Sequence, residues 1–116
     1  MAQTFYHATM TATVTPADYG DALDNPAQVI HGYGRGGWLR PGTPVYVTKR
    51  PAWTHAASGR TYPAMYLVYH TQGYVVMPEA AAKKFLRCVR VNGAPQADTT
   101  GQGQAIAARM GYHVSQ

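Results

Sequence analysis

Short runs of apolar, aromatic and β-branched residues, separated by turn residues, set the pattern of this chain. Two of them, residues 5–9 (FYHAT) and 45–48 (VYVT), each carry one polar ring, His7 and Tyr46 respectively. Val, Tyr, Phe and Thr are enriched in strands because branched and aromatic side chains pack well on a pleated surface. We therefore predict a strand at each run.

Three later runs also predict strands. Residues 64–70 form the most continuous apolar and aromatic run, which is typical of a central strand buried on both faces. Residues 74–77 follow after a turn and end at a proline. Residues 85–91 alternate, which predicts a strand that turns Arg87 and Arg90 to solvent.

Helix-forming residues and stop signals predict three short helices. Glu79 and Lys83 lie four residues apart in an Ala-rich segment, a spacing that supports a helix. Pro51 suits a first helical turn, and Gly59 suits a helix end. The predicted helices are residues 51–57, 79–84 and 100–110.

A glycine-rich segment, residues 31–38, contains a literal G-x-G-x-x-G pattern. In dinucleotide-binding folds this pattern follows a strand and opens a helix. Pro41 and Pro44 come so soon afterwards that no helix can open here. We predict a mobile surface loop with a half-buried Trp38, on which Arg35 and Trp38 are candidates to hold a phosphate and stack on a base.

These elements predict an α+β fold, with mixed or antiparallel sheets and short peripheral helices. A chain of 116 residues is expected to form one domain, residues 1–116, and 46% hydrophobic residues are enough for a core. No apolar run approaches the ~20 residues that span a bilayer. No signal peptide is visible, so we expect a cytoplasmic protein.

Charge is unevenly distributed. The first 34 residues contain three aspartates and no Lys or Arg, whereas all ten basic residues lie between Arg35 and Arg109. Only Glu79 and Asp98 oppose them there, and the formal net charge is +5. This excess favours an anionic partner, such as nucleic acid, an acidic surface or a phosphorylated small molecule.

Metal binding is not expected, because the five histidines are scattered singly and Cys88 is the only cysteine. Carboxylate chemistry has few candidates, since Glu79 and Asp98 are the only acids after Tyr46.

The residues Tyr-His-Ala-Thr at 6–9, followed by Val-Tyr-Val-Thr at 45–48 and an Ala-rich segment, resemble the H-Y-[acid] class of ADP-ribosyltransferases. Within that class the chain is most similar to the rifamycin ADP-ribosyltransferases, whose first motif reads Tyr-His-Gly-Thr. The resemblance covers roughly residues 4–76, and Ala8 stands where the family has glycine. It implies an ADP-ribosyltransferase-like fold and a protein that uses NAD. An active transferase and a catalytically silent NAD-binding relative both fit.

The resemblance also implies roles for individual residues. His7 would hydrogen-bond the nicotinamide-side ribose, and Tyr46 would stack on the nicotinamide ring. The backbone of Ala8 would pair with the carboxamide, and Thr9 would support the strand. The ordinary alternatives are a structural histidine and a packed tyrosine.

Two further roles follow from the same resemblance. Arg35, with Arg40 or Lys49 behind it, would screen the pyrophosphate. Of the two acids, Glu79 is the better candidate for the third motif residue because it follows the strand at 74–77. The ordinary alternative is a carboxylate at a helix start.

A second class of function remains open, namely a non-enzymatic basic binding module for nucleic acid or an acidic protein surface. An accessory protein of a phage or mobile element that inhibits a host system would fit this class. Its interface would use Tyr33, Arg35, Trp38, Lys49, Arg50, Arg87 and Arg90.

Overall fold

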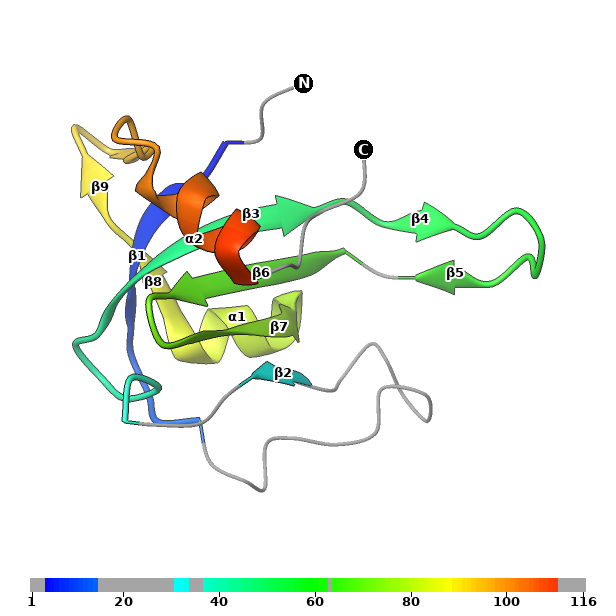
Figure 1. The fold of residues 1–116 in the computed structure, drawn as a ribbon, viewed down its shortest axis with the longest axis horizontal. Coiled ribbons are helices and arrows are strands. Elements are labelled where there is room, and N and C mark those ends of the chain that lie inside the picture. The colour runs from blue at the N-terminus through cyan, green and yellow to red at the C-terminus, as the bar shows by residue number, and fades with distance from the viewer. Residues whose placement is uncertain (1–3, 15–30, 34–36, 63, 111–116) are drawn as a thin grey trace.

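The structure is a computed structural model that describes residues 4–14, 31–33, 37–62 and 64–110. Six strands form one sheet in the order β2-β7-β6-β3-β1-β8, and every pairing within it is antiparallel (Figure 1). These strands are β1 (Tyr6–Met10), β2 (His31–Tyr33), β3 (Pro44–Arg50), β6 (Met65–His70), β7 (Gly73–Pro78) and β8 (Leu86–Cys88).

Two strand pairs and two helices complete the described fold. The pairs are β4 (Trp53–Thr54) with β5 (Thr61–Tyr62), and β9 (Arg90–Val91) with β10 (Ala94–Pro95). The helices are α1 (Glu79–Phe85) and α2 (Gln102–Met110). The predicted α+β class is confirmed, with a mostly antiparallel sheet and short helices. Neither helix of the described chain is long and apolar enough to cross a membrane.

Each face of the sheet packs against one helix (Figure 1). Side chains alternate between faces along a strand, so neighbouring residues enter different clusters. The face called here the α1 face buries Ala8, Met10, Val45, Val47, Val68, Val75 and Met77 with Ala82 and Phe85 of α1. The face called the α2 face buries Phe5, Met65, Leu67, Tyr69 and Val76 with Ile106 and Ala107 of α2.

The strongest sequence patterns are confirmed. Strands occur at both ring-bearing runs and at 74–77, and β6 lies centrally between β7 and β3. The predicted helices at 79–84 and 100–110 correspond to α1 and α2. The predicted strand at 85–91 is broken into β8 and β9, and Arg87 and Arg90 are exposed as expected.

The predicted helix at 51–57 is wrong. This segment belongs to a hairpin, because β3 and β6 are antiparallel neighbours and the chain prolongs their pairing through β4 and β5. The His55 amide donates to the Arg60 carbonyl at 2.9 Å. Gly59 has a φ of +70°, so it serves the hairpin turn and does not end a helix.

The predicted loop at 31–38 is corrected in part: residues 37 and 38 lie in a turn, and residues 34–36 lie outside the described residues. Residues 31–33 form β2, which pairs with β7 at the edge of the sheet. Trp38 is 3% exposed and belongs to the α1-face cluster, so it is fully buried and does not present its ring to a base. Its ring stacks on His70, with centroids 5.0 Å apart and planes 4° from parallel.

Candidate functional site

His7 and Tyr46 meet on the α2 face. The antiparallel register of β1 and β3 sets these two residues directly opposite each other. Facing residues on paired strands have Cβ atoms ~5 Å apart, so side chains of this size touch. The ring centroids are 5.3 Å apart, and the rings are tilted by 51°. The structure therefore brings together the two rings that the sequence singled out.

A cavity of ≈ 200 Å³ opens beside this pair. Its lining comes from β1, β3, α2 and the end of β6, and consists of His7, Pro44, Val45, Tyr46, His70, Thr71 and Ile106. Mostly apolar walls with a few polar groups are typical of small-molecule sites. Enclosed drug-sized ligands need roughly 300–1,000 Å³, so this cavity suits one ring system with its neighbouring atoms.

The phenol of Tyr46 is held in one orientation. Its hydroxyl donates a hydrogen bond to Oε1 of Gln102 in the first turn of α2. Burial, followed by the negative charge of Asp98, raises the pKa of Tyr46 above its ordinary value. The hydroxyl therefore stays protonated at neutral pH, and the ring presents an uncharged π face.

Asp98 lies behind His7. The segment before α2 runs along β1, where the His7 amide donates to the Gln96 carbonyl at 3.0 Å and the Asp98 amide donates to the Phe5 carbonyl at 2.7 Å. The Asp98 side chain is only 2% exposed, and its Oδ1 lies 3.7 Å from Nε2 of His7. A buried carboxylate therefore stands beside the imidazole.

The Asp98 carboxylate also anchors the start of α2. Its Oδ1 accepts from the amide of Thr100 at 3.0 Å and from the Thr100 hydroxyl at 2.6 Å. Its Oδ2 accepts from the Gly103 amide at 2.9 Å. Burial raises the pKa of Asp98, but the hydrogen bonds from Thr100 and Gly103, together with His7, outweigh that effect and lower it below its ordinary value. The carboxylate is ionised at neutral pH.

His70 closes one side of the cavity. It is the last residue of β6, and its Nδ1 accepts from the Gln72 amide at 3.2 Å. Burial lowers the pKa of His70, so its ring is a neutral imidazole at neutral pH. The stacked Trp38 fixes the plane of this ring.

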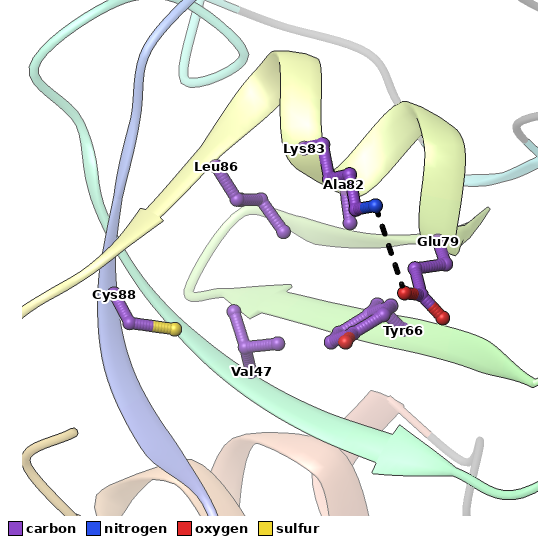
Figure 2. A pocket seen from close by; sticks show the side chains of 7 residues that line it. All are labelled: Val47, Tyr66, Glu79, Ala82, Lys83, Leu86 and Cys88. Carbon is purple, nitrogen blue, oxygen red and sulfur yellow. Dashed lines mark ion pairs between the residues drawn. The ribbon is translucent and has the colours of Figure 1, made fainter. Parts of the chain in front are cut away.

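Glu79, the acid preferred from the sequence, is not brought to this pair. It begins α1, which packs on the α1 face, and it lines a different cavity of ≈ 180 Å³ with Tyr66, Cys88 and others (Figure 2). There its carboxylate lies 4.0 Å from Nζ of Lys83, and both side chains are largely exposed. The sheet separates Glu79 from His7 and Tyr46.

The other residues expected at the site are placed as follows. The Ala8 side chain is 1% exposed in the α1-face cluster, and its backbone lies in the ladder between Val45 of β3 and Cys88 of β8. Thr9 pairs with Pro44 and Arg87 in the same ladder.

Of the basic residues expected near a pyrophosphate, Arg40 and Lys49 do not line the cavity. Arg35 lies outside the described residues. Arg40 donates from Nε to the Gly37 carbonyl, and Lys49 places Nζ 5.7 Å from the centre of the Tyr66 ring. Within the described chain, the cavity lining contains no Lys or Arg.

Sequence reasoning named Asp98 but preferred Glu79. The signal in favour of Asp98 was its place in the segment DTTGQ, immediately ahead of the final helix. Side-chain oxygens of Asp and Thr at such positions accept from the first helical amides. In the described residues, no group of three or more His, Cys, Asp or Glu side chains is placed to hold a metal ion.

Comparison of the chain with known protein families, curated proteins and solved structures found no match.

Proposed function

We propose that the protein is ADP-ribosyltransferase-like, binding the nicotinamide end of NAD beside His7 and Tyr46 and transferring ADP-ribose to an acceptor. The observation that carries the proposal is the facing pair of rings on β1 and β3 beside one cavity. The resemblance of these two strands to the H-Y-[acid] transferases points the same way, and adjacent antiparallel strands suit such a fold.

The electrostatics of the cavity support a flat, positively charged ring as the ligand. Oxidised nicotinamide is such a ring. Tyr46 offers an uncharged aromatic face, which attracts cations. His70 is neutral and does not repel a positive charge. Asp98 contributes a fixed negative charge behind His7.

In the transfer step the protein itself forms no covalent bond. The bond between C1′ of the ribose and the nicotinamide nitrogen breaks, and its electron pair leaves with nicotinamide, which becomes neutral. A nucleophilic atom of the acceptor forms the new bond to C1′ and gives its proton to solvent. Positive charge grows on the ribose meanwhile, and a preorganised negative group lowers the barrier.

Asp98 is a positioning residue in this proposal. Its oxygens are occupied by Thr100 and Gly103, and its side chain is buried, so it acts through His7 and through its charge. Tyr46 of β3 and Ile106 of α2 line the same cavity and would confine the ring beside His7.

The test measures NAD binding by thermal shift and nicotinamide release by chromatography. Tyr46→Ala should weaken NAD binding about fivefold, as expected when an aromatic contact of about 1 kcal/mol is lost. His7→Ala should abolish nicotinamide release. Tyr46→Phe keeps the ring and loses only the bond to Gln102, so it should bind nearly as well as the parent protein.

Tyr66→Ala is the matched control, because Tyr66 lines the cavity on the other face. It should leave both readouts unchanged. NAD binding without nicotinamide release would assign the silent, NAD-binding form of the proposal. If the parent protein shows no stabilisation by millimolar NAD, or if the Tyr66 variant loses it equally, the proposal fails.

A further inference from the structure

A two-stranded hairpin projects from the sheet beyond the ends of β3 and β6 (Figure 1). It is called here the arm and comprises residues 49–62, of which Lys49 and Arg50 at its base still pair with β6. Trp53 pairs with Tyr62 and Thr54 with Thr61, so the ladder continues along the arm. Residues 51–61 are all exposed. Beyond β3, residues 51–55 at about 3.3 Å each extend ~16 Å from the sheet before the turn.

The arm carries basic residues on both sides of its turn. Lys49 and Arg50 end β3 at the base of the arm, Arg60 immediately precedes β5, and the arm contains no Asp or Glu. The guanidinium carbon of Arg50 lies 4.6 Å from the centre of the Trp53 ring, which orders its planar donor group. The arm therefore presents cations without a carboxylate of its own to neutralise them.

Local hydrogen bonds shape the tip of the arm. The Nδ1 of His55 lies 3.0 Å from the Ser58 hydroxyl oxygen, and the Gly59 amide donates to the His55 carbonyl at 2.8 Å. The hydroxyl groups of Thr54 and Thr61 lie 3.2 Å apart across the ladder. The tip is thus ordered by polar contacts, although it packs on no core. An isolated two-stranded hairpin is only marginally stable in water, so a partner would add much of its order.

We infer that the arm enters the major groove of a B-form DNA duplex. A flat acidic surface reaches only one side of a ribbon, whereas a groove lines both sides with phosphates. The major groove is about 12 Å wide and admits a two-stranded ribbon. The deep, narrow major groove of an A-form RNA duplex does not. This inference is independent of NAD binding, because the arm and the His7 cavity share no residue.

The test is fluorescence anisotropy with a labelled duplex of about 20 base pairs, at salt concentrations from about 50 to 200 mM. Three cations on phosphates predict a slope of about −2.7 in log affinity against log salt. Replacing Arg50 and Arg60 by Ala should reduce the slope to about −0.9. It should also weaken binding on the order of 50-fold at 0.1 M salt.

The matched control replaces Lys83 and Lys84, two exposed cations of α1, by Ala. It removes the same charge and should change affinity less than about threefold if the arm is the contact. An RNA duplex and single-stranded DNA of the same sequence should bind at least tenfold more weakly. The inference is overturned if the control variant loses as much affinity, if either competitor binds as tightly, or if no duplex binding occurs at low salt.

Discussion

The two faces of the sheet hold their carboxylates in opposite ways. On the α2 face, Asp98 is buried, accepts three hydrogen bonds and stands beside His7. On the α1 face, Glu79 is about half exposed, and its carboxylate lies 4.0 Å from Nζ of Lys83, beyond hydrogen-bonding distance. An exposed pair of this kind contributes ~0–1 kcal/mol, whereas a buried charge that loses its partners is costly. On the α2 face, one carboxylate therefore both anchors the start of α2 and lies beside the His7 ring that lines the cavity.

The largest effect is expected for Asp98→Ala. Three donors would lose a buried acceptor, and α2 would lose the carboxylate that anchors its first turn. We expect the free energy of unfolding to fall by about 3 kcal/mol in urea titrations. NAD binding should weaken as well, because α2 carries Gln102 and Ile106. A loss smaller than about 0.5 kcal/mol would mean that the two faces do not differ in this way.

A smaller loss is expected for Gly103→Ala. A Cβ at this position would lie 2.9 Å from Cβ of Phe5, which cannot rotate away because it is bonded directly to the backbone just before β1. Overpacking costs about 1–3 kcal/mol and outweighs the gain of up to about 1 kcal/mol from replacing helical glycine. We expect a net loss of about 1 kcal/mol. The exposed Gln104→Ala in the same helix is the control and should change stability by less than about 0.5 kcal/mol.

The pH dependence of stability separates the faces further. The pKa of Asp98 is lower in the folded state than in the unfolded chain, so the folded state binds fewer protons in that range. The stabilisation is complete above the unfolded pKa near ~4 and is lost as the pH falls through the folded pKa. Urea midpoints should show the advantage of the parent protein over Asp98→Asn shrinking below about pH 4. An advantage that stays constant through that range would contradict the assigned pKa shift.

The smallest effect is expected for Glu79→Gln. This change removes an exposed ion pair and keeps the shape of the side chain. Stability should change by less than about 0.5 kcal/mol, and NAD binding should not change. A large loss of NAD binding would instead assign the acid of the proposed site to Glu79, on the α1 face.

Much of the sheet could be predicted because its strands are encoded locally. Dense runs of β-branched and aromatic residues produced β1, β3, β6 and β7, and an Ala-rich segment with a favourable charge pair produced α1. A helix was wrongly predicted at 51–57 because the alanines of this segment favour one. Its conformation is instead imposed by the pairing of β3 with β6. The same applies to β2, whose glycines predicted a loop and whose strand depends on β7.

The pairing of His7 with Tyr46 could be predicted from the sequence, whereas the position of Asp98 beside His7 could not. His7 and Tyr46 were recognisable because each stood in a strong strand pattern. Glu79 was preferred because it followed a strand, but strand order along the chain does not show which face the next helix will cover. Asp98 reaches His7 because residues 96–98 run along the edge of β1, a contact across most of the chain that no local pattern indicates.

The most direct test of the His7–Tyr46 cavity is an NMR titration with NAD that follows aromatic, imidazole and cysteine resonances on both faces. We expect saturable shifts at His7 and Tyr46, with Tyr66 and Cys88 unchanged. Shifts confined to Tyr66 and Cys88, or no saturable shift on either face at millimolar NAD, would contradict this expectation.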